Sequence, residues 1–429
     1  MVSAALFISL FLFWFLNVPV GIAIGMSAVV AILAGGTLSL GFVTQALVNG
    51  IDSFPIMAIP LFILAGELMG QGGVSRRLLN VCNVFFGRVS GGLAIVTVAM
   101  CMMFSAVSGS SPATVAAVGS MVVPTMLERG YSKSFTLALI ACAGTLGIIF
   151  PPSIPMVIYG AATGTSISTM FMAGFLPGMF ISIVLMFFCY FYCKKKGFHG
   201  DDTEPFTWKR AWSAIWDAKW ALINPVIILG GIYGGFFTPT EAAAVAVVYA
   251  FICGVFIHRE MGGKKIIATL GNACSTTGTT LVILGCATAF AQILTIEQIP
   301  QMLTVAISNI SDNRIVILLV INLFLLIVGL FMDPTPAMLI LSPILLPVAL
   351  SFGLHPVHFG IIMVVNLAIG FFTPPIGVNL FVASRIGNEG IETISRGIVP
   401  FVLVMFVCLM LITYVPQIAM ILPSILGGR

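Results

Sequence analysis

The chain has 429 residues, of which 59% are hydrophobic and only 7% are charged. Soluble domains carry roughly a quarter charged residues, so this composition excludes a soluble protein and indicates a polytopic membrane protein. Apolar runs of spanning length recur from Ala4 to Leu426 and leave no segment polar enough to form a separate soluble domain. The net charge of +4 gives no sign of a nucleic-acid partner, because the positions of the basic residues explain it better.

Residues 1–49 are expected to form N-terminal scaffold helices. The start, MVSAALFISL, lacks the basic region of a cleavable signal peptide, so we expect it to remain as the first membrane helix. The nine cysteines lie mostly in apolar runs, and we interpret them as small buried residues, not as disulfides or metal ligands.

The lysines and arginines predict the orientation of the chain. When the apolar runs are threaded through a bilayer, sixteen of the 18 basic residues fall on one face and only Arg314 and Arg429 fall on the other. By the positive-inside rule, the face with sixteen basic residues is cytoplasmic.

Residues 197–274 are expected to hold an interfacial helix followed by further scaffold helices. Tryptophans recur there every four residues, which on a helix makes one aromatic stripe beside several basic residues. This pattern is typical of a helix that lies in the membrane interface, although a solvated loop is the alternative. The residues of the stripe are Trp208, Trp212, Trp216 and Trp220.

A shift of 223 residues brings many glycines and prolines of the chain into register. Because these residues constrain the backbone, the register predicts two copies of one structural unit, at 50–196 and 275–429. The basic residues place the copies in opposite orientations, as in secondary transporters whose sites lie between inverted repeats. Matching pairs include Pro124 with Pro347, Gly147 with Gly370, and Pro151 and Pro152 with Pro374 and Pro375.

Each repeat contains two interruptions. The first is a re-entrant helical hairpin, expected at 92–127 and 315–350, because arms of about 16 residues reach only ~24 Å and the hydrocarbon core is ~30 Å thick. The second is a discontinuous helix, expected at 134–165 and 356–385, where a double proline breaks a run long enough to span. The freed carbonyls of such a break suit a small cation, and the half-helix N-termini suit an anion.

Asp333 lies at the tip of the second hairpin, in GLFMDPTPAML, and aligns with Ser110 of the first. A carboxylate at membrane depth costs about 2.5–3.5 kcal/mol, which a bound cation would offset. With the hydroxyls of the tips and carbonyls of the breaks, Asp333 could complete oxygen cages for a monovalent cation. A helix cap is the alternative role for Asp333, and close packing of small residues is the alternative for the Ser-rich first tip.

Five stretches of the chain carry a family resemblance: DSFPIMAIPLFILAGELM (52–69), FSAVSGSSPATVAAVGS (104–120), GTLGIIFPPSIPMVIYG (144–160), GGIYGGFFTPTEAAAVA (230–246) and GLFMDPTPAMLILSPILLPV (329–348). They resemble the large membrane subunit of tripartite ATP-independent periplasmic (TRAP) transporters, over nearly the whole chain. The resemblance implies a multi-pass protein of the bacterial inner membrane, an elevator transporter that carries an organic acid anion inward with sodium. It favours the sialic-acid branch, with C4-dicarboxylates next.

The resemblance also implies partners. A periplasmic binding protein would deliver the substrate, and a small four-helix membrane subunit would brace the scaffold. Because the chain starts with the large-subunit pattern, we expect that small subunit to be a separate polypeptide. No cofactor is expected, and sodium is the only metal implied.

The resemblance implies two sodium sites with substrate between them. The first site takes the tip 105–111 and the break 144–148, with Ser105, Ser108, Ser110, Ser111, Gly144, Thr145 and Gly147. The second takes the tip 329–336 and the break 366–373, with Gly329, Asp333, Thr335, Asn366, Gly370 and Thr373. Candidate hydrogen-bond donors to the substrate are Ser153, Asn366 and Asn379. No basic residue lies in either tip or break, so half-helix N-termini are expected to hold the substrate anion.

Other functions fit the sequence less well. An intramembrane enzyme is disfavoured because the four histidines all lie at predicted loop ends, too far to activate a serine of SGSSP. We interpret His355 and His358 as a surface pair without further metal ligands nearby, and Glu67 and Glu241 as helix-end or scaffold residues. A primary pump is disfavoured because the phosphate-loop motif is missing, and broken inverted repeats favour alternating access over a channel. A stand-alone Na⁺- or H⁺-coupled anion transporter is the alternative.

Overall fold

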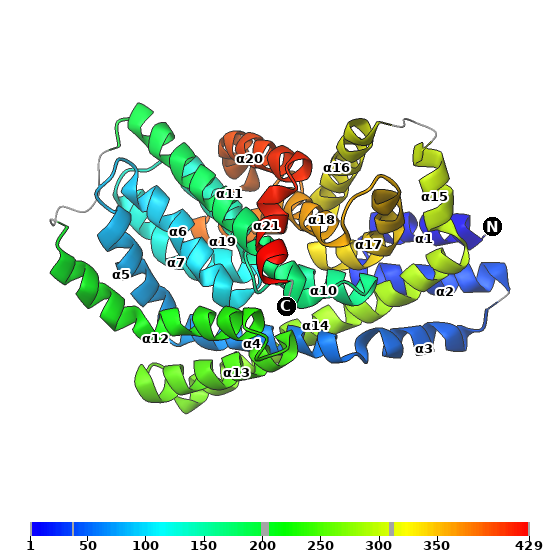
Figure 1. Cartoon of the computed structure of the whole chain (residues 1–429), viewed down its shortest axis with the longest axis horizontal. Coiled ribbons are helices and arrows are strands. Elements are labelled where there is room, and N and C mark those ends of the chain that lie inside the picture. Colours follow the sequence, from blue (N-terminus) through cyan, green and yellow to red (C-terminus); the bar gives the residue numbers. More distant parts are fainter. Residues whose placement is uncertain (1, 37, 199–205, 309–312, 428–429) are drawn as a thin grey trace.

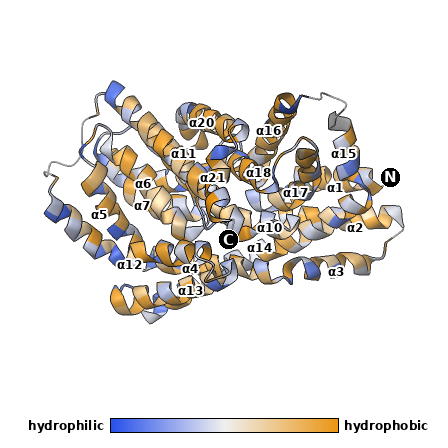
Figure 2. Ribbon diagram, viewed as in Figure 1, coloured by the Kyte–Doolittle hydropathy of each residue, from blue (hydrophilic) through white to orange (hydrophobic). Residues whose placement is uncertain are grey.

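The computed structural model describes residues 2–36, 38–198, 206–308 and 313–427, and throughout these ranges the regular structure is helical. Within them, eight helices are long and apolar enough to cross a membrane, or up to nine if a bent pair counts as one span. Apolar residues cover most of the helix surfaces, and hydrophilic residues gather mainly toward helix ends and loops (Figure 2). The expected class, an all-α polytopic membrane protein, is confirmed.

Two groups of helices surround the repeated hairpins and broken helices. In the first group, α2 and α3 pack side by side on α14, the longest helix of the described chain (Figure 1). In the second, α4 packs on α13, and α5 packs on α12. These helices are α1 (Val2–Phe15), α2 (Val20–Gly35), α3 (Leu40–Ile51), η1 (Phe54–Met57), α4 (Ala58–Gln71), α5 (Val74–Phe86), α12 (Trp208–Tyr233), α13 (Pro239–Ile252), η2 (Cys253–Ile257), α14 (Gly263–Ile296) and α15 (Ile299–Ser308).

The hairpins are built from α6 (Gly92–Ser108) with α7 (Ser111–Glu128), and from α16 (Arg314–Phe331) with α17 (Pro334–Ser351). Each has a two-residue tip. The residue at the N-cap position of the second helix is Ser110 in the first hairpin and Asp333 in the second, with proline close behind each, and of the two only the Asp333 side chain accepts a capping hydrogen bond. α16 and α17 are each 18 residues long, so length alone would allow them to cross a membrane. Both tips end inside the protein, which fits hairpins that turn back within it.

The broken helices are interrupted where the double prolines lie. In the first copy, α8 (Lys133–Ala143) and α9 (Leu146–Ile149) are followed by a break and α10 (Ile154–Thr163), with a bend of 41°. In the second copy, α18 (Pro356–Gly370) is followed by a longer break and α19 (Val378–Gly387). Both Pro-Pro bonds are cis. Long helices follow each break, α11 (Ile167–Lys195) and α20 (Ile391–Tyr414), and α21 (Gln417–Leu426) comes last.

The second copy repeats the helix starts of the first. Helices α7 and α8 begin at Ser111 and Lys133, and α17 and α18 begin at Pro334 and Pro356, each 223 residues later. The starts of α6, α10 and α11 are matched to within one residue by those of α16, α19 and α20. The same shift carries α3 and α4 together onto the single helix α14, so the structural likeness begins before residue 50.

The two copies also pack on each other reciprocally. Helix α10 of the first copy packs on α17 of the second, and the equivalent α19 packs on the equivalent α7 (Figure 1). Such exchange is what a pseudo-two-fold relation between inverted repeats requires. An ion pair also joins the two copies. Lys133, at the start of α8, donates a hydrogen bond of 2.6 Å to Glu389, which lies between α19 and α20. This hydrogen bond and the charge of Lys133 lower the pKa of the Glu389 carboxyl.

The tryptophan stripe belongs to a longer helix than expected. It forms the first half of α12, which continues without interruption from Trp208 to Tyr233. The tryptophans are exposed, from 80% at Trp208 to 36% at Trp220, and the opposite side of the helix buries alanines such as Ala211 and Ala218. The stripe is therefore one face of a continuous helix that packs on α5, and its position in the membrane interface stays a prediction.

Two glycines allow the second hairpin to touch the second broken helix. A Cβ on Gly370 would overlap the backbone of Gly329, and one on Gly329 would lie 3.1 Å from the Cα of Gly370. Only residues without a side chain permit this approach of α16 to α18.

We therefore expect Gly370→Ala to destabilise the protein by roughly 1–3 kcal/mol, because overpacking forces the two backbones apart. The measurement is the melting temperature of the purified protein in detergent. Gly271→Ala on α14 is the matched control, since its Cβ would enter open space. Equal melting temperatures for the two variants would contradict the close approach.

Candidate functional site

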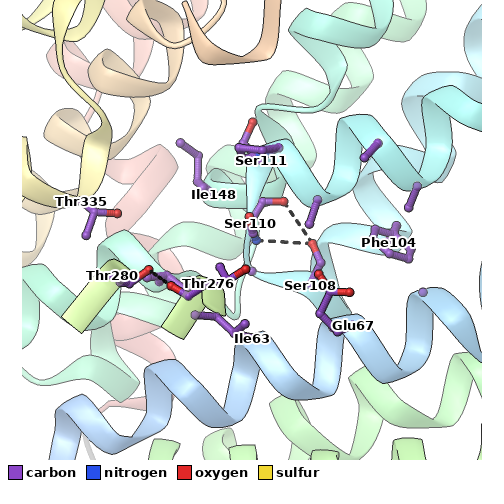
Figure 3. A pocket seen from close by; sticks show the side chains of 18 of the residues that line it. Ile63, Glu67, Phe104, Ser108, Ser110, Ser111, Ile148, Thr276, Thr280 and Thr335 are labelled. Atoms are coloured by element: carbon purple, nitrogen blue, oxygen red, sulfur yellow. Dashed lines mark hydrogen bonds between the residues drawn. The ribbon is translucent and has the colours of Figure 1, made fainter. Parts of the chain in front are cut away.

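A cavity of about 830 Å³ lies where both hairpin tips face the scaffold helices α4 and α14 (Figure 3). Ser108 and Ser110 line it from the first tip, and Asp333 and Thr335 line it from the second. The opposite walls are formed by α4 and by a row of hydroxyl residues on α14. Asp333 and Glu67 are the charged residues of this lining, which contains no lysine, arginine or histidine from the described chain.

The first tip gathers oxygen atoms at the start of α7. The Ser108 hydroxyl lies 2.9 Å from the Thr114 hydroxyl, and both donate to the carbonyl of Ser110, over 3.2 and 2.8 Å. A Cβ on Gly147 would lie 2.5 Å from the Ser110 carbonyl oxygen, so the first break touches this tip directly. Of the predicted first sodium site, the structure therefore brings Ser108, Ser110 and Gly147 together.

Thr114 is missing from the sequence prediction, although it belongs to this cluster. It lies four residues after Ser110, on the same face of α7, and that helical spacing is the signal that could have identified it.

The other residues of the predicted first site lie around this cluster. The hydroxyl of Ser105 donates to the carbonyl of Cys101 in its own helix, and that of Thr145, just after α8, donates to the carbonyl of Cys142 at the end of α8. Each hydroxyl oxygen keeps acceptor capacity in this arrangement. Gly144 packs against Val115 of α7. Ser111 also lines the cavity, and its hydroxyl lies 3.1 Å from the Oδ1 atom of Asn379.

Asp333 caps α17 at the second tip. Its Oδ1 atom accepts a hydrogen bond of 2.8 Å from the backbone N–H of Thr335, and its side chain is half-buried at the cavity wall. The capping role, which the sequence left as an alternative, is thus present in the structure. A carboxylate has further lone pairs, so the cap leaves it able to bind a cation as well.

The rest of the predicted second site forms two groups. Gly329 and Gly370 meet at the backbone, beside Thr373, whose hydroxyl donates to the carbonyl of Ile369 over 2.6 Å. Asn366 instead points to Asn322 of α16, with 2.5 Å from Nδ2 to Oδ1. The Oδ1 of Asn366 is buried and has no hydrogen-bond partner among the described residues.

The three predicted substrate donors are fully buried, and none of them lines the cavity. Ser153 caps α10 and donates to the carbonyl of Ile148 over 2.6 Å. Asn379 donates to the Ser111 hydroxyl and to the Ala141 carbonyl, over 2.7 and 2.8 Å. Their contact with substrate stays a prediction that this geometry does not support.

The histidines show no metal site. His199 lies outside the described residues, and no group of three or more His, Cys, Asp or Glu residues in the described part could hold a metal. The expectation of a surface pair is wrong for His358, which is 1% exposed and lies 2.9 Å from the carbonyl of Ile412, because α20 packs over the first turn of α18. His355 caps the start of α18.

The two glutamates have different environments. Glu241 forms a capping box with Thr238 at the start of α13, as a helix-end residue. Glu67 lies within α4 and lines the cavity. All nine cysteines are free, and eight of them are buried, as the sequence predicted.

Paired repeats of a hairpin and a discontinuous helix, with a polar cavity between the tips and a scaffold, define the membrane component of a secondary transporter. Residues 7–418 match the family model described as "Tripartite ATP-independent periplasmic transporter, DctM component", and the chain belongs to this family. It is therefore a multi-pass protein of the bacterial inner membrane and a transporter permease, not an enzyme.

Characterised relatives cover nearly the whole chain. It is 49% identical over 95% of its length to the isethionate TRAP transporter permease protein DctMQ of Oleidesulfovibrio alaskensis, and it spans 64% of that relative. It is 42% identical to the C4-dicarboxylate TRAP transporter large permease protein DctM of Vibrio cholerae, over 100% of this chain and 99% of the relative. Identity to the sialic acid large permease SiaM of the same organism is 37%, over 96% of each chain.

The fold also resembles a solved structure. The match is to the YdaH transporter of Alcanivorax borkumensis, described as having an unusual topology. The TM-score is 0.61 at 15% identity, over 87% of this chain and 88% of that one. At this identity the likeness supports the fold alone.

The buried link from Asn379 to Ser111 joins the second broken helix to the first hairpin. We expect Asn379→Leu to cost roughly 1–3 kcal/mol for each polar group left without a partner, including the Ala141 carbonyl. The melting temperature should fall well below that of Asn80→Leu, a matched change at an exposed position of α5. The same melting temperature in both variants would show that the link contributes little.

Proposed function

We propose that this chain is the permease component of a sodium-coupled importer of a small organic acid anion. The observation that carries the proposal is the cavity bounded by both hairpin tips, which contains carboxylates and hydroxyls but no basic side chain from the described residues. An anion in such a cavity needs a cation beside it, because the protein supplies no positive side chain to offset its charge. Sodium bound at the tips would supply that charge.

The proposed sodium ions bind at the two tips. Hard monovalent cations prefer oxygen ligands, and the first tip offers Ser108, Ser110 and Thr114 oxygens within hydrogen-bond distance of one another. At the second tip, Asp333 offers a carboxylate, with Thr335 beside it at the cavity wall. The unpaired Oδ1 of Asn366 is a further oxygen ligand, one that a small rearrangement of α18 would bring to the second site.

We propose that the conformation is inward-facing and that transport uses an elevator motion. The cavity runs from the tips to Gln71 on α4 and Ser275 on α14, toward helix ends that carry basic residues and are predicted to be cytoplasmic. The tips and breaks would move together past α4 and α14. Gly66 would support such sliding, because it has no side chain and a Cβ at this position would lie only 3.0 Å from the Cα of Ser108.

The substrate and partners follow from the relatives. Identity is higher to the isethionate and C4-dicarboxylate permeases than to the sialic-acid permeases reported above, so we place these two small acids before sialic acid as candidate substrates. The tripartite name supports a periplasmic binding protein and a small membrane subunit. One relative is named DctMQ and is longer than this chain, so a separate small subunit stays a proposal.

The test is uptake into proteoliposomes that contain this chain with its small subunit, with and without binding protein, under a Na⁺ or an H⁺ gradient. We expect Na⁺-driven uptake of isethionate, succinate or sialic acid that requires the binding protein. Uptake without binding protein would favour the stand-alone transporter, and uptake driven equally by protons alone would overturn the sodium coupling.

Asp333→Asn separates the two roles of this residue. Asparagine is as good an N-cap as aspartate, so the melting temperature should stay within a few degrees of wild type. Removal of the charge should raise the Na⁺ concentration for half-maximal uptake by about tenfold or abolish uptake, because one ligand charge is lost.

Asp333→Ala, which loses both roles, is the comparison. If Asp333→Asn transports with unchanged Na⁺ dependence and only Asp333→Ala fails, Asp333 is a helix cap and the coupling ion binds elsewhere.

A further inference from the structure

Glu67 is a carboxylate that the sodium sites proposed above do not use. It lies within α4, on the cavity wall opposite Asp333, and its side chain is next to Ser108 in Figure 3. The backbone agrees with this placement, because a Cβ on the adjacent Gly66 would lie 3.0 Å from the Cα of Ser108. Glu67 therefore faces the first tip from the scaffold side.

No positive side chain neutralises Glu67 in the described structure. The ion pairs near this end of α4 involve other residues, since Arg77 contacts Glu260 over 2.9 Å. Lys265 lies at the cavity mouth, where its ammonium donates to the backbone carbonyl of Gln71 over 2.7 Å. Negative charge thus lies deep in the cavity, and positive charge lies at its predicted cytoplasmic rim.

These charges favour the movement of an anion from the hairpin tips toward the cavity rim. An anion at the tips is repelled by Glu67 and attracted toward the rim, and a sodium ion at the tips is held by Asp333. Because Glu67 belongs to the proposed static scaffold and Asp333 to the moving hairpin, only Asp333 would stay with the cargo through the whole transport cycle. Glu67 would face the cargo only in this inward-facing state.

We propose that Glu67 is a release residue, a fixed negative charge that weakens anion binding in the inward-facing cavity and so favours discharge into the cytoplasm. This inference rests on the proposed function for its cargo, but the charge that it assigns to the cavity can be measured without any substrate. Its chemistry requires only that the cargo be anionic.

The first experiment measures the electrostatic potential of the cavity. Thr280→Cys places a thiol on the α14 wall, in a background with Cys274→Ser to remove the exposed native cysteine. We compare how fast a cationic and an anionic methanethiosulfonate react with this thiol in the purified complex. A unit charge at about 8 Å changes the ratio of the two rates by roughly fivefold. Glu67→Gln should lower the cation-to-anion ratio by about that factor, and Glu67→Asp should preserve it.

Glu241→Gln is the matched control, because it removes the same charge far from the cavity while glutamine can keep the capping box. An unchanged ratio in Glu67→Gln, or an equal fall in Glu241→Gln, would overturn the proposal.

The second experiment measures the release of substrate. It uses whichever of isethionate, succinate or sialic acid the wild-type protein accumulates in the vesicles. Substrate loaded inside the vesicles inhibits uptake by occupying the inward-facing carrier. In Glu67→Gln, half-inhibition should need roughly two- to threefold less internal substrate, because the charge now acts on one anion and not on a ratio of two rates. The external half-saturation should stay unchanged, and Glu67→Asp should restore the wild-type value.

A structural defect would lower the maximal rate of uptake but leave unchanged the internal substrate concentration that gives half-inhibition. That result would overturn the proposal. If the wild type accumulates none of the panel, the proposed function fails, and the thiol measurement still decides whether Glu67 sets the charge of the cavity.

Discussion

Every helix that ends inside a membrane protein leaves backbone N–H and C=O groups without partners, and an apolar surrounding makes each of them costly. This chain has four such ends near its centre, two hairpin tips and two breaks. The structure places tips and breaks against each other: the N–H of Ile154 donates to the carbonyl of Gly109 over 3.3 Å, and Gly370 lies against the backbone of Gly329. The polar cavity exists because this concentrated backbone polarity requires a water-accessible or ion-filled space beside it.

The same requirement bears on the observed and the proposed role of Asp333. A tip that starts a helix within the membrane needs a cap, and Asp333 supplies it to the N–H of Thr335. Asparagine would cap as well, so capping alone does not require a charge. The charge is explained if the tip also binds a cation, since a carboxylate at this depth is otherwise costly. The first tip has Ser110 at the equivalent position, but its side chain accepts no capping hydrogen bond, so the two copies differ in both the cap and the charge.

Much of the fold could be predicted from the sequence because glycine and proline report backbone geometry directly. The double prolines locate both breaks, and the shift of 223 residues gives the starts of α16 to α20 to within one residue. The continuity of α12 could not be predicted in this way. Its first half is amphipathic and its second half apolar, and this change of pattern looks like two elements unless the packing of α5 against it is known.

The side-chain partners at the site were less predictable, since they depend on contacts between the two copies. Asn379 has the residue type and depth of a substrate ligand, yet it is used to join the broken helix of one copy to the hairpin of the other. Asn366 is similarly taken up by Asn322. Residue type and register identify where polarity is concentrated, and only the fold decides which polar groups satisfy one another and which face the cavity.

The distribution of charge around the cavity completes this argument. Polar groups that the fold has paired are neutral and buried, whereas the charged side chains of the cavity lining, Glu67 and Asp333, lie half-buried at its wall. One belongs to α4 and the other to a hairpin tip, so any relative motion of tip and scaffold changes the distance between them. If the tip and the scaffold move past each other as proposed, these two like charges would make the energy of a bound ion depend on conformation. In the proposed cycle this dependence would let the inward-facing cavity hold its cargo less tightly than an outward-facing one, and a lower affinity on the cytoplasmic side favours release there.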